Sequence, residues 1–132
     1  MTTLLLRAAR PLCAIYAAAL FVATHIPVAQ LPPLHTSDKL LHFGAYAIFG
    51  LLLAAAWDPG RAPARRALMS ALGALALFAA LDELLQIPVG RHGDPWDWLA
   101  DVAGAAAGLI AARALLARWR ARATGDRGAL DR

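Results

Sequence analysis

Charged residues are scarce in this chain. Only 17% of the 132 residues are charged, whereas 60% are hydrophobic even before its 10 glycines are counted. Soluble globular proteins average about 25% charged residues and roughly 45–50% apolar residues with glycine included. A soluble fold of this size would expose much apolar surface to water, which argues against a cytosolic enzyme. Intrinsic disorder is excluded because it requires low hydrophobicity.

Cysteine is almost absent as well. The single cysteine, Cys13, excludes a disulfide scaffold. The remaining class is a small all-α integral membrane protein, because about four spans of roughly 20 residues fit within the chain. The net charge of +4 does not indicate a nucleic-acid partner, since the basic residues flank apolar segments instead of forming a separate arm.

Apolar runs separated by proline, glycine and charged residues predict a four-helix transmembrane bundle in one domain, 1–132. Pro11 is expected at the first helical position of the first span, and Ser37 as the N-cap of the second. A cleaved signal peptide is the alternative for the first run, although it lacks an A-x-A site at a suitable distance. The predicted spans are 11–26, 40–57, 67–87 and 97–116, followed by a basic tail, 117–132, that we expect to fray.

The distribution of charge predicts an orientation. The N-terminus, the 58–66 loop and the C-terminal part hold 11 of the 13 basic residues. The positive-inside rule therefore predicts cytoplasmic termini in a multi-pass protein of the bacterial inner membrane. The opposite, outer side would hold all four histidines and six of the nine acidic residues, namely His25, His35, His42, His92, Asp38, Asp82, Glu83, Asp94, Asp97 and Asp101.

Ionisable residues within apolar spans are costly, so they indicate function by default. Helical spacing places several of them on shared faces at i, i+3 or i, i+4. These neighbours are Lys39 with His42, Asp82 and Glu83 with Gln86, and Asp97 with Asp101.

Each of these groups also has a structural interpretation. Lys39 either extends to lipid headgroups or pairs with a carboxylate of the third or fourth span. Asp82 and Glu83 either line a functional pocket or are satisfied by a cation or backbone. Gln86 is more often a contact between helices than a ligand.

The loop before the fourth span is a predicted tight turn, in which Gly93 supplies a positive φ. Arg91 either contacts Asp94 within this turn or binds an anionic headgroup or phosphate. Asp97 and Asp101 either cap the fourth span and neutralise Arg91, or ligate a metal.

Metal and dimer sites are weighed from the same residues. Carboxylates with His42 or His92 would suit a divalent ion, but no recognised ligand motif is present. We therefore predict neither a metal nor a cofactor. Gly104 and Gly108 form a GxxxG motif, which we expect to serve packing within the bundle ahead of dimerisation.

Two motifs in this set resemble the VanZ-like family of small bacterial membrane proteins. The first is D-K-x-x-H, and the second is D-E-x-x-Q followed by R-x-G-D-x-x-D. The resemblance covers about Thr36 to Gly108, and the bulky Pro95-Trp96 pair departs from the family pattern. The matching residues are Asp38, Lys39, His42, Phe43, Asp82, Glu83, Gln86, Arg91, Gly93, Asp94, Asp97 and Asp101.

The resemblance implies association with the cell envelope, without a settled activity. The family is named after a protein linked to resistance against teicoplanin, a glycopeptide that binds cell-wall precursors. The partners it suggests are membrane lipids and a lipid-linked cell-wall precursor.

The leading hypothesis is an outer-leaflet polar site that recognises an anionic or lipid-linked envelope ligand. One alternative is a small enzyme acting on a lipid phosphate, with Glu83 or His42 as general base. A proton relay is disfavoured because the inner halves of the spans are almost purely Ala, Leu and Gly, and a purely structural role is the last alternative. The first span should contribute least. The predicted ligand-binding residues are Lys39, His42, Asp82, Glu83, Gln86, Arg91, Asp94, Asp97 and Asp101.

Overall fold

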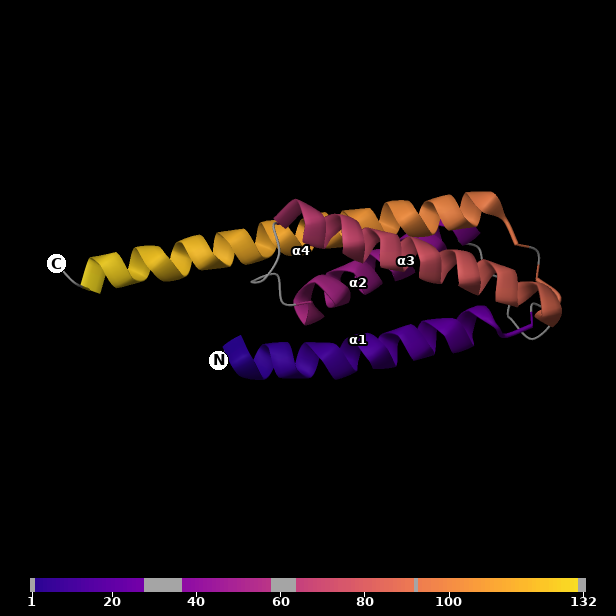
Figure 1. The fold of residues 1–132 in the computed structure, drawn as a ribbon, viewed down its shortest axis with the longest axis horizontal. Coiled ribbons are helices and arrows are strands. Elements are labelled where there is room, and N and C mark those ends of the chain that lie inside the picture. Colours follow the sequence, from indigo (N-terminus) through magenta and orange to yellow (C-terminus); the bar gives the residue numbers. More distant parts are fainter. Residues whose placement is uncertain (1, 28–36, 58–63, 92, 131–132) are drawn as a thin grey trace.

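The computed structural model describes residues 2–27, 37–57, 64–91 and 93–130. Over these residues successive helices run in opposite directions, so the start of the first and the end of the last lie at the same end of the molecule (Figure 1). The elements are α1 (Thr2–Thr24), α2 (Asp38–Ala56), α3 (Ala64–Gln86), a short 3₁₀ helix η3 (Ile87–Val89) and α4 (Pro95–Leu130).

Three helical segments are long and apolar enough to cross a membrane. They are Asp38–Ala56, Arg65–Val89 and Pro95–Trp119. In α1 the apolar part is shorter and covers Ala8–Thr24. The chain is therefore an all-helical membrane protein, and a crossing by α1 stays a prediction.

The side chains are arranged as a bilayer requires, with apolar groups outside and polar groups inside. Large hydrophobic residues such as Ile15, Leu77 and Leu84 are each more than 60% exposed. Such a surface is stable against lipid and not against water. The interior instead buries six polar or charged residues, namely His42, Asp82, Glu83, Gln86, Asp97 and Asp101.

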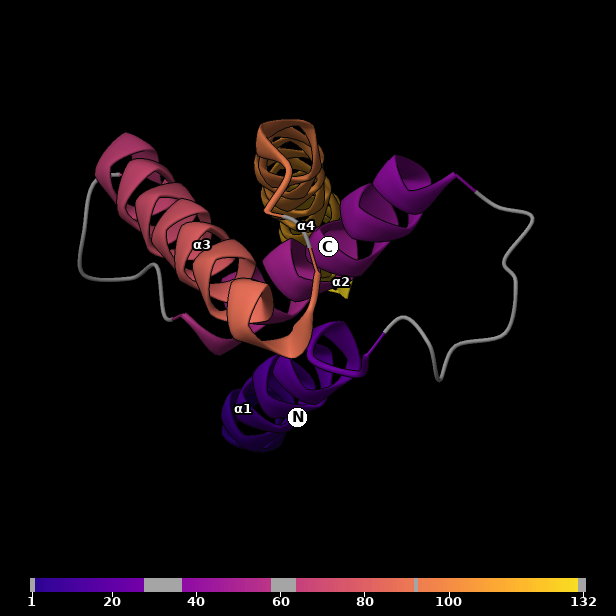
Figure 2. The same ribbon diagram turned by 90° about the vertical axis from the view of Figure 1, so that its right-hand side faces the viewer.

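α2 lies between α1 and α4, and α3 packs mainly against α4 (Figure 2). Glycines allow α2 and α4 to approach closely. A Cβ atom at Gly50 of α2 would lie 2.5 Å from the Ala105 carbonyl oxygen. A Cβ atom at Gly104 or Gly108 would overlap the backbone of α2 at Phe43 or Ala47. The GxxxG motif thus serves packing within the chain, as its spacing predicted.

Two helix boundaries differ from the sequence-based expectation. Pro11 lies inside α1 and not at its first position, because the Leu- and Ala-rich residues before it already form helix. The predicted tail is helical as far as Leu130, and the alanine and arginine residues of 117–123, which are strong helix formers, continue α4 past residue 116. Ser37 precedes α2 as predicted, but its side chain makes no capping hydrogen bond.

Candidate functional site

One end of each of the four helices lies at the end of the molecule opposite the chain termini (Figure 1). Polar side chains of these helices and of the residues beside them meet there. We call this group the polar cluster. Hydrogen bonds, ion pairs or close electrostatic interactions connect its members, which are Thr24, His25, Lys39, His42, Tyr46, Asp82, Glu83, Gln86, Asp94, Asp97 and Asp101.

A buried pair forms the centre of the polar cluster. The Nδ1 atom of His42 on α2 lies 2.9 Å from Oδ1 of Asp101 on α4. The His42 side chain is 8% exposed and that of Asp101 is fully buried. The second Asp101 oxygen, Oδ2, is buried without a hydrogen-bond partner among the described residues. One carboxyl oxygen therefore orients the imidazole while the other is unsatisfied.

Asp82 joins α3 to α1. Its Oδ1 accepts a hydrogen bond of 2.9 Å from the Thr24 hydroxyl, and its Oδ2 accepts one of 3.1 Å from Gln86. The Nδ1 atom of His25 lies 3.6 Å from the same carboxyl group. The first apolar segment was expected to contribute least, and its contribution to the polar cluster is limited to Thr24 and His25. The signal was present in the sequence, because Thr24 and His25 are the polar residues of that segment.

Lys39 connects α2 to the start of α4. Its ammonium group lies 2.9 Å from Asp94 and 3.0 Å from Asp97. The predicted pairing with a carboxylate is confirmed for Asp97 of the fourth span and extends to Asp94 in the preceding loop. The Lys39 ammonium group also holds the pKa of the Asp94 carboxyl below its usual range.

The structure decides two points that the sequence left open in the loop before α4, and it corrects a third. Asp94 contacts Lys39 and not Arg91. The residue with positive φ is Gly90, at 80°, and not Gly93, because the 3₁₀ helix η3 ends on a left-handed residue. The side-chain cap of α4 is Asp94, whose Oδ1 accepts from the Trp96 amide at 2.9 Å, and not Asp97 or Asp101.

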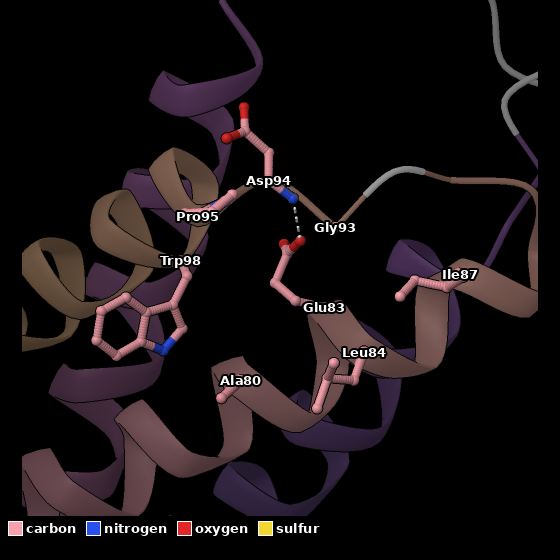
Figure 3. A pocket seen from close by; sticks show the side chains of 8 residues that line it. All are labelled: Ala80, Glu83, Leu84, Ile87, Gly93, Asp94, Pro95 and Trp98. Carbon is pink, nitrogen blue, oxygen red and sulfur yellow. Dashed lines mark hydrogen bonds between the residues drawn. The ribbon is translucent and has the colours of Figure 1, made fainter.

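Glu83 connects the polar cluster to a pocket. Its Oε2 accepts a hydrogen bond of 3.0 Å from the Asp94 amide, which attaches α3 to the start of α4. Beside this bond, the pocket between α3 and α4 has a volume of about 350 Å³ (Figure 3). Its lining is mostly apolar and consists of Ala80, Glu83, Leu84, Ile87, Gly93, Asp94, Pro95 and Trp98.

The site thus gathers eight of the nine predicted ligand-binding residues. The ninth, Arg91, lies in the loop beside them, and its guanidinium group makes no ion pair within the described parts of the chain. His35 and His92 lie outside the described residues.

The family comparison covers most of the chain. The model of the VanZ/LLP1 family matches residues 7–117. The chain belongs to the VanZ/LLP1 family. No curated protein and no solved structure matches it. The resemblance stated from residues 36–108 is therefore confirmed, and the VanZ/LLP1 match extends over α1 and beyond residue 108 of α4.

In this VanZ/LLP1 member, replacing Lys39 should destabilise the outer part of the polar cluster. Lys39→Met leaves the carboxyl groups of Asp94 and Asp97 facing each other without a cation, so the melting temperature in detergent should fall. Because the Lys39–Asp94 ion pair is partly exposed to solvent, this decrease in melting temperature should be smaller in 1 M salt, where screening is strong. Lys39→Arg, which keeps the charge, is the matched control. An unchanged melting temperature for Lys39→Met at low salt would contradict this role.

Proposed function

We propose that this VanZ/LLP1 membrane protein binds an anionic, lipid-linked ligand of the bacterial envelope in the pocket beside the polar cluster. The observation that carries the proposal is the two-part lining of the pocket. Ala80, Leu84 and Trp98 offer an apolar wall to a hydrocarbon chain. The Glu83 carboxyl group and the backbone amide of Asp94 form a polar end that continues into the rest of the polar cluster (Figure 3). A volume of about 350 Å³ lies within the range of about 300–1,000 Å³ that ligand pockets occupy.

Arg91 supports an anionic headgroup. It is separated from η3 only by Gly90 and is half buried at the same end of the molecule as the pocket. An arginine without an internal ion pair is suited to bind a phosphate through two parallel hydrogen bonds. Lys39 is less suited, because Asp94 and Asp97 already occupy its ammonium group.

The location of the site supports a role at the outer leaflet. Both termini lie at the end opposite the polar cluster (Figure 1), and the basic residues concentrate toward the termini. With the termini in the cytoplasm of a bacterium, the pocket faces the outer leaflet of the inner membrane. Lipid-linked cell-wall precursors are exposed there, and a protein that binds them could reduce the effect of teicoplanin.

Filling the pocket should weaken ligand binding. Ala80→Phe places a phenyl ring in the apolar half, and we expect affinity for a polyprenyl diphosphate to fall by about tenfold or more, the effect of about 1.4 kcal/mol of lost apolar contact. Binding is measured by native mass spectrometry of the full chain in neutral detergent. If the link to resistance holds, a susceptible bacterium expressing the wild type should tolerate more teicoplanin than one expressing Ala80→Phe.

The matched control is Leu81→Phe, which adds a similar ring at a lipid-facing position of the same helix. It should bind as the wild type does. Phosphatidylglycerol, titrated in parallel, separates an ordinary anionic lipid from a lipid-linked diphosphate. Equal binding of neutral phosphatidylcholine, or equal losses in the two Phe variants, would contradict the proposed site.

The buried His42–Asp101 pair favours one further candidate, an enzyme that hydrolyses the phosphate ester of the same ligand. In such a step His42 would take a proton from an attacking water, with its ring oriented by Asp101, and the leaving lipid oxygen would receive a proton. Release of polyprenol and inorganic diphosphate from the bound polyprenyl diphosphate distinguishes turnover from binding.

A further inference from the structure

Three buried side chains from three different helices converge in the polar cluster. His42 of α2, Glu83 of α3 and Asp101 of α4 each offer one ligand atom, and these atoms lie within 4.8 Å of one another. His42 is 8% exposed, Glu83 is 7% exposed and Asp101 is fully buried. Two ligand atoms at about 2.0–2.2 Å from one ion lie at most about 4.4 Å apart. The three side chains therefore need to move only slightly closer together to coordinate one ion.

Two buried polar atoms beside these groups have no partner among the described residues. One is Oδ2 of Asp101 and the other is the hydroxyl of Tyr46, a residue only 1% exposed. Tyr46 lies outside the triad of His42, Glu83 and Asp101, but it is near the carboxyl groups of Asp101, Asp82 and Glu83. Buried polar groups without partners are rare, and each calls for an explanation such as an ion or an ordered water.

The charges around these atoms are unbalanced. The carboxyl groups of Glu83 and Asp101 lie close together in the interior, with the imidazole of His42 as the nearest basic group. The ammonium group of Lys39 is engaged by two other carboxylates. Burying carboxylates without a counter-charge costs several kcal/mol each, and a divalent cation would offset that cost.

We propose that His42, Glu83 and Asp101 bind a divalent cation of the zinc or manganese class, contrary to the expectation from sequence that no metal is bound. Two carboxylates and one imidazole are the donor set of such ions, because imidazole favours transition metals over magnesium and calcium. The cation would bond to the free Oδ2 of Asp101. A water on the cation would give the Tyr46 hydroxyl its missing partner.

A second group, Asp38, His42 and Asp97, has comparable spacing but is the weaker candidate. The Lys39 ammonium group lies 3.0 Å from Asp97, and its positive charge repels a cation there. Asp38 is also exposed, so water already satisfies its carboxylate.

The cation site adjoins the pocket through Glu83, which belongs to both. The coordination of a ligand phosphate by this cation, described next, rests on the proposed function. An anionic headgroup would otherwise meet the carboxyl group of Glu83 at the polar end of the pocket. A cation on Glu83 reverses the local charge, so that the phosphate of a lipid-linked ligand completes its coordination while the hydrocarbon chain lies along Leu84 and Trp98.

The test is metal binding by the full-length protein in neutral detergent. After removal of metal with a chelator, the protein is titrated with Zn²⁺ and separately with Mn²⁺, and bound metal is counted by mass spectrometry. We expect one ion per chain. Glu83→Gln and Asp101→Asn should each weaken binding by at least about tenfold, since even outer-shell changes cost about 10–100-fold. Asp82→Asn is the matched control, because this buried carboxyl lies outside the triad, and it should bind as the wild type does.

Several outcomes would overturn the cation site. The first is that the wild type binds no ion, and the second is that Asp82→Asn weakens metal binding as much as the triad variants do. The third is that Asp97→Asn weakens metal binding while Glu83→Gln does not, which would indicate the second group, Asp38, His42 and Asp97. If a variant does not fold, the wild type still decides the matter. The electron spin echo of bound Mn²⁺ should show modulation from an imidazole nitrogen, and its absence would overturn ligation by His42.

Chelation separates this inference from the proposed function. Loss of polyprenyl diphosphate binding on chelation supports a cation that bridges protein and phosphate. Lipid binding that survives chelation overturns the bridge and leaves the proposed function intact. Metal binding in a protein that binds no phosphate lipid overturns the proposed function and leaves the cation site intact.

Discussion

Gly108→Ala is expected to lower the free energy of unfolding by about 1–3 kcal/mol or more, although it adds a single methyl group. That methyl group would overlap the carbonyl oxygen of Ala47 on α2. The obstacle is backbone, which cannot rotate away as a side chain does, so α2 and α4 must separate. Their separation weakens the most extensive helix contact of the molecule and displaces the polar cluster, because both helices supply its central pair. Gly104→Ala should have a similar effect, because its methyl group would overlap the backbone of Phe43.

Gly44→Ala is the matched control for this prediction. A Cβ atom at Gly44 would meet nothing within 4 Å. The substitution should leave stability unchanged or raise it by up to about 0.5–1 kcal/mol, because alanine favours helix over glycine. Equilibrium unfolding in mixed micelles, followed by circular dichroism, provides the free energies. Equal effects of Gly44→Ala and Gly108→Ala would show that α2 and α4 are not in close contact.

His42→Leu should cost about 3–5 kcal/mol in metal-free protein, the range found when one partner of a buried ion pair is removed. The substitution leaves both oxygens of Asp101 buried without a partner, because Oδ2 has none in the wild type. The double variant His42→Leu/Asp101→Leu should recover much of the loss, since two apolar groups of similar size replace the pair. The same unfolding measurement in micelles gives all values of the double-mutant cycle.

His25→Leu is the comparison for this second prediction. His25 is also near a buried carboxyl group, at 3.6 Å from Asp82, but Thr24 and Gln86 still satisfy that group after the change. Its cost should therefore be smaller. A loss for His42→Leu no larger than that for His25→Leu would contradict the central role of the His42–Asp101 pair.

Helical spacing predicted neighbours on one face of a helix. One of these pairs, Gln86 with Asp82, forms a hydrogen bond. Contacts between helices were harder to predict. Lys39 was expected to meet a carboxylate of the third or fourth span, yet the choice of Asp97 together with Asp94 depends on where α4 begins.

The contact of α1 with Asp82 was not predicted for a related reason. Thr24 and His25 lie at the end of the shortest apolar segment, and nothing local in the sequence connects them to Asp82, which lies 58 residues from Thr24. The turn geometry was misplaced for a different reason. Both Gly90 and Gly93 can adopt a positive φ, and the unpredicted 3₁₀ helix η3 requires it at Gly90.

The sequence by itself determined that this protein belongs in a membrane, how its apolar segments divide, and which ionisable residues gather at one end. These properties depend on composition and on periodicity along the chain, which require no knowledge of packing. Tertiary structure alone decided that His42 meets Asp101, that Glu83 belongs to both the triad and the pocket, and that α1 completes the polar cluster. Such pairings depend on how closely and at which register the helices pack, and backbone contacts at Gly50, Gly104 and Gly108 set that approach.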